Sequence, residues 1–201
     1  MQSLRERTKL MAWSAIHDAA AELALEKGPG ATTIEAIAER AGVSRRTFFN
    51  YFAAKEDAIL GMSTPSLNED AMREFRAGDE PLLHRVALLR VAVVRTMLGD
   101  AKVYRRRRDV LASFPELEDR LLARTEVQVD ETVVPFLVEE LAGTDIVAAA
   151  DAATVARILL VNARSIVRLA YRISPDTLED DDLTAVSEAF GVHRLALQAC
   201  L

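Results

Sequence analysis

The sequence is poor in several residue types, and each shortage excludes a class of protein. Only one of 201 residues is cysteine, Cys200, so neither a disulfide framework nor a thiolate metal cluster can form within one chain. A reducing, cytoplasmic setting is therefore expected. No apolar run reaches the roughly 18 residues that a membrane span needs, and the N-terminus lacks the pattern of a signal peptide. His17, His84 and His193 share no ligand spacing, so no metal or cofactor is expected.

Glycine and proline are also scarce, at 8 and 6 residues, which favours long helices over sheets and loops. Half of the residues are apolar and 28% are charged, the balance of a folded globular protein. The net charge of −6 is unevenly distributed. Residues 1–60 carry eight Lys or Arg and eight Asp or Glu, whereas residues 61–201 carry 17 and 23. An acidic total does not exclude DNA binding, which needs only a local basic face.

Apolar spacing and breaker residues predict an all-α protein with a short-helix and a long-helix part. The predicted helices cover residues 8–27, 32–41, 44–51, 53–60, 82–98, 101–113, 115–141, 151–173 and 183–200. The second helix is predicted to start at Thr32 or Thr33, where Thr32-Thr33-Ile34-Glu35 matches a capping box. No strand pattern and no internal repeat is present.

The second and third predicted helices are joined by Gly42-Val43-Ser44, the layout of a helix-turn-helix. Gly42 suits a left-handed C-cap, and Ser44 suits the N-cap of the next helix. On that third helix Phe48 and Phe52 lie four residues apart and share a face that should pack inwards. The opposite side then presents Arg45, Arg46, Phe49 and Asn50.

These outward side chains suit the major groove of DNA. Arginine binds guanine O6 and N7, asparagine binds adenine N6 and N7, and an aromatic edge can contact a thymine methyl group. The hydroxyls of Thr47 and Tyr51 suit phosphate oxygens. Thr33, at a helix start, and Lys55, beyond the third helix, are expected to reach the phosphate backbone.

The stretch TTIEAIAERAGVSRRTFFNYFAAKEDAIL resembles the N-terminal DNA-binding segment of TetR-family transcriptional regulators. The resemblance covers roughly residues 16–60. It implies a helix-turn-helix domain at residues 1–56 and a helical ligand-binding and dimerisation domain at residues 57–201. Together with Ser44 at the helix start, the DNA-contacting positions expected are Thr33, Arg45, Arg46, Thr47, Phe49, Asn50, Tyr51 and Lys55.

Several charged or polar residues outside this segment allow two interpretations. Arg90 and Arg95 interrupt an apolar helix and are either an anion clamp in a ligand pocket or members of ion pairs. Asn162, on the apolar side of residues 151–173 with Ile166, binds either a ligand or a neighbouring helix. Arg5, Arg7 and Lys9 are either a DNA-contacting arm or a solvated terminus.

The run Tyr104-Arg105-Arg106-Arg107-Arg108 is either a second nucleic-acid patch or structural. A structural role is favoured, because consecutive residues on a helix point in all directions.

The sequence therefore predicts a ligand-responsive, sequence-specific regulator, a repressor that binds a near-palindromic DNA operator as a homodimer and is released by a small apolar or amphipathic effector. Arg90 and Arg95 suggest an anionic or acyl-type effector. A helical protein-interaction adaptor without sequence-specific DNA binding is the alternative. An enzyme is the least favoured class, because no nucleophile elbow, phosphate-binding glycine loop or metalloprotease signature is present.

Overall fold

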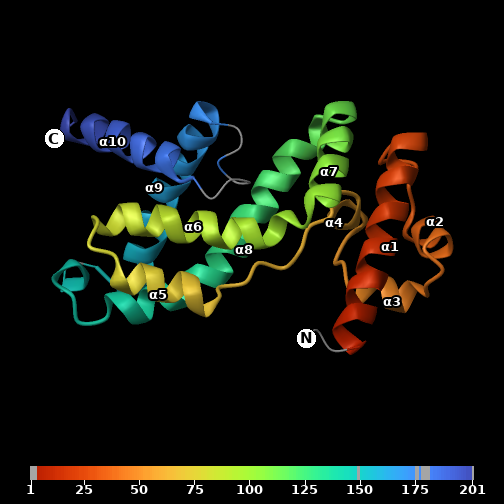
Figure 1. The fold of residues 1–201 in the computed structure, drawn as a ribbon, viewed down its shortest axis with the longest axis horizontal. Coiled ribbons are helices and arrows are strands. Elements are labelled where there is room, and N and C mark those ends of the chain that lie inside the picture. Colours follow the sequence, from red (N-terminus) through yellow and green to blue (C-terminus); the bar gives the residue numbers. More distant parts are fainter. Residues whose placement is uncertain (1–3, 149, 175–176, 178–181, 201) are drawn as a thin grey trace. The chain divides into compact units, whose positions relative to one another are not determined.

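The protein is all-α in a computed structural model that describes residues 4–148, 150–174, 177 and 182–200 (Figure 1). No strand occurs in this described part. The elements are α1 (Leu4–Lys27), α2 (Ile34–Arg40), α3 (Arg45–Phe49), α4 (Lys55–Ile59), α5 (Glu69–Ala77), α6 (Leu82–Leu98), α7 (Ala101–Ser113), α8 (Glu116–Leu141), the short 3-10 helix η1 (Asp145–Ala148), α9 (Ala152–Ile173) and α10 (Thr184–Gln198). None of the described helices is both long and apolar enough to cross a membrane.

The chain forms two compact units. The N-terminal unit consists of Met1–Ser63 and Leu98–Arg124, and the C-terminal unit of Thr64–Met97 and Thr125–Leu201. Within the N-terminal unit, α1 packs on α2, α4 and α7. Small side chains on α1 allow this close packing, because Ala19, Ala20, Ala21 and Ala24 are all buried.

The basic helix α7 is tied to α1 and α4 by its own arginines. Arg106 pairs with Asp18 at 3.2 Å and with Glu22 at 3.0 Å. Arg107 is only 6% exposed and donates to the carbonyls of Leu60 and Gly61, each at 2.7 Å. Burial lowers the pKa of Arg107 to about 10, so its guanidinium remains charged at neutral pH. These contacts support the structural interpretation of the arginine run.

A buried histidine completes this junction. His17 is fully buried, and its Nδ1 lies 2.8 Å from the carbonyl oxygen of Ala58, to which it donates. Burial lowers the pKa of His17 and so favours the neutral ring. The end of α4 is therefore held from two sides, by α1 and by α7.

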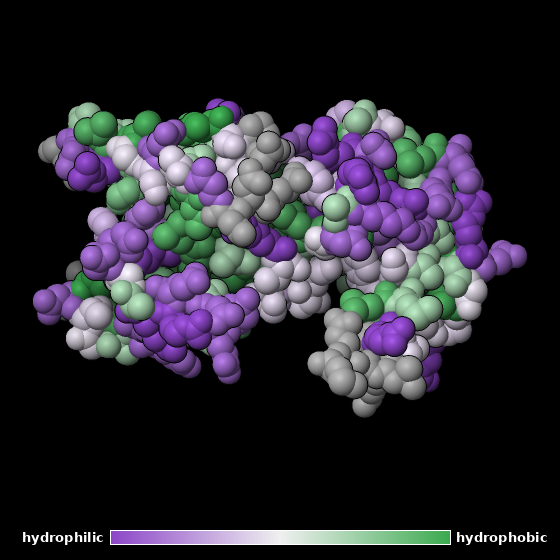
Figure 2. All heavy atoms as spheres, in the orientation of Figure 1, coloured by the Kyte–Doolittle hydropathy of each residue, from purple (hydrophilic) through white to green (hydrophobic). Residues whose placement is uncertain are grey.

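In the C-terminal unit the buried side chains of α6, α8, α9 and α10 include Val86, Leu137, Leu160, Ile166 and Val186. The helices α9 and α10 pack against each other. Both also carry large apolar side chains on their solvent side. These are Ile158, Val161, Tyr171 and Ile173 on α9, and Val192, Leu195 and Leu197 on α10. Figure 2 shows hydrophobic surface along α10, at the upper left.

Several boundaries differ from the sequence-based prediction. The first helix begins at Leu4 rather than Thr8, so the backbone of Arg5, Arg7 and Lys9 is helical. Of the two starts predicted for the second helix, Thr33 is the N-cap of α2, and its hydroxyl accepts from the Ala36 amide, so Thr32 does not form a capping box with Glu35. Thr32 is buried instead, and its hydroxyl donates to the carbonyl of Gly28.

Helix α5 was not predicted, although Asn68 caps it and two acidic residues occupy its first turn. By contrast, the helices at 82–98 and 101–113 have the predicted bounds.

Gly61 is expected to tolerate no side chain. Its φ is +58°, and an added Cβ would lie 2.7 Å from His17 Cε1 and 2.9 Å from Val103 Cγ1. Gly61→Ala should lower the free energy of unfolding by about 2–4 kcal/mol, from backbone strain plus overpacking. Gly28 is the matched control, since its φ is +84° but no atom lies within 4 Å of an added Cβ. Gly28→Ala should cost only about 1 kcal/mol. Urea denaturation measures both, and equal losses would contradict the packing argument.

Candidate nucleic-acid interface

The turn between α2 and α3 is compact because Gly42 adopts a left-handed conformation, with a φ of +67°. The Gly42 amide donates to the carbonyl of Glu39 at 3.1 Å, and the Val43 amide donates to that of Ala38 at 2.9 Å. These bonds satisfy the last carbonyls of α2 and end the helix. Ser44 then caps α3, its hydroxyl oxygen accepting from the Thr47 amide at 3.0 Å. The predicted helix-turn-helix geometry is confirmed.

The inner face of α3 is aromatic. Phe48 is fully buried and Phe52 is 3% exposed, as the sequence predicted. Their rings lie 5.9 Å apart, and the ring of Trp13 on α1 lies 5.4 Å from that of Phe52. This cluster fixes the rotation of α3 about its own axis.

The outer face of α3 exposes the predicted base-reading residues. Arg45, Arg46 and Asn50 are exposed, and Phe49 is 47% exposed despite its apolar ring. The Arg45 guanidinium lies 5.7 Å from the centre of the Phe49 ring. The structure therefore brings two cations, an amide and an aromatic edge to one exposed face.

The hydroxyl groups lie at the helix starts beside this face. Thr33 and Ser44 are exposed caps of α2 and α3. The hydroxyls of Ser44 and Thr47 lie 2.8 Å apart, and Tyr51 is half-buried. Each cap hydroxyl oxygen accepts a hydrogen bond from a backbone amide. A hydroxyl that accepts can also donate its hydrogen, for example to a phosphate oxygen.

One partner on this face was not expected. Glu35, in the first turn of α2, pairs with Arg45 through Oε1 and Nη1 at 2.8 Å. Both side chains are more than 60% exposed, so the pair is weak and can open when a competing partner approaches. Nothing in the sequence indicated this ion pair except the acidic residue itself, because Glu35 was interpreted as part of a capping box.

Lys55 has a set of contacts within the protein. Its Nζ donates to the carbonyls of Pro29 at 2.9 Å, Thr32 at 2.8 Å and Gly30 at 3.4 Å. An ammonium that has three hydrogens is well matched to these carbonyls. The start of α4 is thereby tied to the loop between α1 and α2.

Residues 16–60 match the family described as bacterial regulatory proteins, tetR family. This matched segment is of the TetR type, the DNA-binding part of a transcriptional regulator.

Among solved structures, the chain is similar to Salmonella enterica GusR at 19% sequence identity, with a TM-score of 0.37 over 91% of this chain and 95% of that one. No curated protein matches the sequence.

The four residues predicted to bind a ligand do not gather at one site. Arg90 is 4% exposed and donates to Glu126 at 2.7 Å, so it is held in an ion pair. Burial lowers the pKa of Arg90, and Glu126 opposes this shift. Asn162 donates to the carbonyl of Ile158 and lies 3.1 Å from His193 Nε2 on α10. Ile166 is fully buried.

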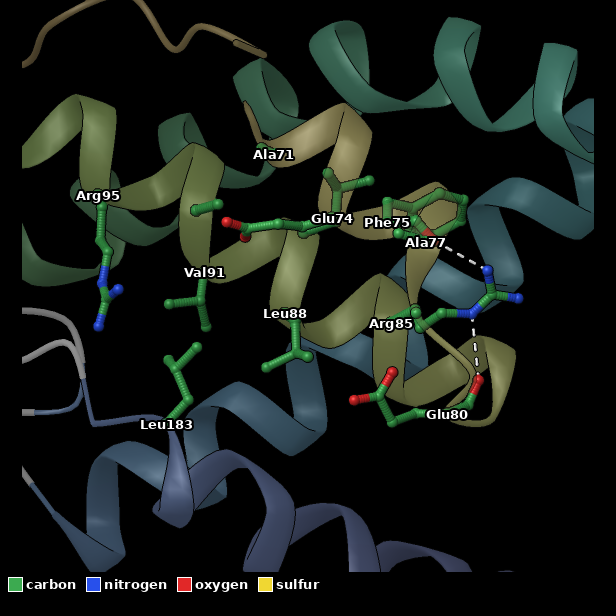
Figure 3. Close-up of a pocket in the computed structure, with 13 residues that line it drawn as sticks. Ala71, Glu74, Phe75, Ala77, Glu80, Arg85, Leu88, Val91, Arg95 and Leu183 are labelled. Atoms are coloured by element: carbon green, nitrogen blue, oxygen red, sulfur yellow. Dashed lines mark hydrogen bonds between the residues drawn. The ribbon is translucent and has the colours of Figure 1, made fainter. Parts of the chain in front are cut away.

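A cavity of about 420 Å³ lies elsewhere in the C-terminal unit, between α5, α6 and Leu183 at the start of α10 (Figure 3). Of the predicted ligand residues only Arg95 lines it, and that arginine donates to the Thr177 carbonyl at 3.0 Å. This cavity was not predicted from the sequence, because α5, which forms part of its lining, was not predicted. No group of three or more His, Cys, Asp or Glu suited to a metal ion occurs in the described part of the chain.

Lys55→Met should lower the free energy of unfolding by about 1.5–3 kcal/mol, because three carbonyls lose a charged donor. Lys27→Met, at an exposed position in the last turn of α1, should cost less than about 1 kcal/mol. Chemical denaturation compares the two variants. An unchanged stability for Lys55→Met, together with weaker DNA binding and a salt slope reduced by about one, would instead mark Lys55 as a phosphate contact.

Proposed function

We propose that this protein is a ligand-responsive, TetR-type repressor that binds a near-palindromic operator as a homodimer. Residues 1–56 act as the DNA-binding domain, and residues 57–201 bind the effector and the partner subunit. The observation that carries the proposal is the exposed face of α3, where Arg45, Arg46 and Asn50 stand beside a half-exposed Phe49. A DNA target puts this activity in the cytoplasm.

The recognition step follows from the chemistry of that face. Arg45 or Arg46 binds a guanine through a bidentate fork, Asn50 binds an adenine, and Phe49 contacts a thymine methyl group. Thr33, Ser44, Thr47 and Tyr51 supply hydroxyls to phosphates on either side. These four phosphate contacts set the register of α3 in the groove. The contacts of the arginines, Asn50 and Phe49 with the bases supply the sequence preference.

Dimerisation is supported by the apolar side chains that α9 and α10 expose. Ile158 and Val161 lie three residues apart on α9, and Val192 and Leu195 lie three apart on α10, so each pair shares a face. A second copy that covers these side chains removes them from water. The two-fold symmetry of such a dimer provides two recognition helices, one from each subunit. They would bind two half-sites that are separated by one or more turns of the DNA.

Release by an effector requires a difference in affinity between two states of the protein. A ligand that prefers the form whose recognition helices are wrongly spaced weakens operator binding by that preference. The cavity between α5, α6 and Leu183 has a volume suited to a small molecule.

Arg45→Ala should weaken binding to the operator by about 1–3 kcal/mol and relax the base preference at one position of each half-site. The reason is the loss of a bidentate contact to a base. Fluorescence anisotropy with the operator and single-base variants of it measures both effects.

Arg108→Ala is the matched control for this experiment. It removes the same charge from an exposed position on α7 and should change neither the affinity nor the base preference beyond a weak, uniform loss. If Arg45→Ala behaves like this control, Arg45 is not a base-reading residue. Salt-independent binding by the wild-type protein would instead point to a protein-interaction adaptor.

Val161→Glu and Leu195→Glu should each convert the dimer to a monomer, because a buried carboxylate without a partner opposes association. Val161 is 58% exposed and Leu195 62% exposed in the single chain, so neither change should unfold it. Val127→Glu on α8, at 51% exposure, is the control and should leave a dimer. Light scattering after gel filtration gives the mass. Dimers in all three variants would place the interface elsewhere.

A further inference from the structure

The cavity between α5, α6 and Leu183 is lined by both apolar and charged side chains. Its apolar walls come from Ala71, Phe75, Leu88, Leu89, Val91, Ala92 and Leu183. Four charged side chains also line it, Glu74, Glu80, Arg85 and Arg95. In Figure 3, Leu88, Val91 and Leu183 border one common space. A ligand with both an apolar body and a charged group fits such a lining.

The arginines near the cavity already have partners within the protein. Arg85 donates to the carbonyls of Phe75 at 2.9 Å and Glu80 at 3.1 Å, and its guanidinium lies 5.1 Å from the centre of the Phe75 ring. Figure 3 shows this guanidinium directed away from the space that Leu88 borders. Arg95 donates to the Thr177 carbonyl. Arg90, on the same helix, is buried against Glu126 on α8.

The carboxylates of the cavity lack such partners. Among the described residues, no cation pairs with the side chain of Glu74 or Glu80. In Figure 3 the carboxylate of Glu80 is directed to the side where Leu88 lies, and the carboxylate of Glu74 ends near Val91. Gly78 leaves room for one of them, because a Cβ there would lie 2.7 Å from Glu80 Oε2 and 3.0 Å from Arg85 Cδ. A side chain at position 78 would therefore displace the carboxylate or the arginine.

We infer that this cavity binds an amphipathic cation, with its apolar part against Leu88, Val91 and Leu183 and its positive group beside Glu74. The anionic effector suggested by Arg90 and Arg95 is disfavoured, because Arg90 pairs with Glu126 and does not line the cavity, and Arg95 donates to the Thr177 carbonyl. A bound cation gives Glu74 a partner that the described part of the protein does not supply, in an exposed pair of modest strength. The inference deepens the proposed function, since the same cation would be the effector.

Three probes that share one tail test the ligand class. Decyltrimethylammonium, decanoate and decanol carry a cationic, an anionic and an uncharged head group on a similar apolar tail. Titration calorimetry on the full-length protein, below micelle-forming concentrations, compares their affinities. Decyltrimethylammonium should bind most tightly and decanoate least. Equal affinities, a preference for decanoate, or no binding by any probe would overturn the inference.

Two variants test the position of the charge. Glu74→Gln should weaken decyltrimethylammonium binding about fivefold and leave decanol unchanged, because only the ion pair is lost. Glu74→Lys should reverse the preference in favour of decanoate. Glu74 is exposed, so neither change threatens folding. Glu131→Gln, at an exposed position on α8 outside the cavity lining, should match the wild type. A loss that is equal in Glu74→Gln and Glu131→Gln would reject Glu74 as the partner.

The binding result and the regulatory result can be separated. Calorimetry without DNA tests the cavity alone, and its outcome stands whether or not the protein binds an operator. Anisotropy with operator DNA then tests release. Binding of decyltrimethylammonium without any change in operator affinity would keep the ligand class and reject its role as effector.

Discussion

The rotation of α3 is the constraint on which the recognition surface depends, and Phe48 sets it. This ring is fully buried, edge-on to Phe49 at 5.5 Å and tilted against Phe52 at 5.9 Å. A helix of only five residues has little stability of its own, so tertiary packing must hold it. Because successive residues are about 100° apart on a helix, burying Phe48 places Arg45 and Phe49 on the edges and surface of the unit. One buried ring thus orients the groups that we propose to contact DNA.

A second set of contacts holds the end of α4, where the chain leaves the helix-turn-helix segment. The last carbonyls of a helix lack internal partners and carry partial negative charge. Here Arg107 donates to Leu60 and Gly61, while His17 donates to Ala58. A buried guanidinium is costly unless it is fully hydrogen-bonded, and these carbonyls supply that compensation. Because Arg107 comes from α7 and His17 from α1, three helices of the N-terminal unit share one polar core.

The sequence predicted the features that are local. Gly42, Ser44 and the spacing of Phe48 and Phe52 each act within four residues, and all three were identified. The predictions were wrong where two adjacent residues could play the same role, or where a contact with a distant segment determines the structure. Thr32 and Thr33 can each cap a helix, and the burial of Thr32 selects Thr33. The partner of Arg90 lies on α8, at a sequence separation that no periodicity reveals. The cavity needs α5 and Leu183 together, which only the fold brings about.

The pair between Arg45 and Glu35 bears on how a protein whose N-terminal segment has no net charge could discriminate among DNA sequences. Glu35 and the Phe49 ring hold the Arg45 guanidinium in place, so less side-chain entropy is lost when a base binds it. The carboxylate also repels phosphate, which opposes binding that relies on the backbone alone. A guanine can replace the carboxylate with two hydrogen bonds, whereas other bases offer a poorer exchange. If Arg45 reads a base as proposed, the acid at Glu35 lowers affinity for DNA in general while it raises the difference in affinity between the right and the wrong sequence.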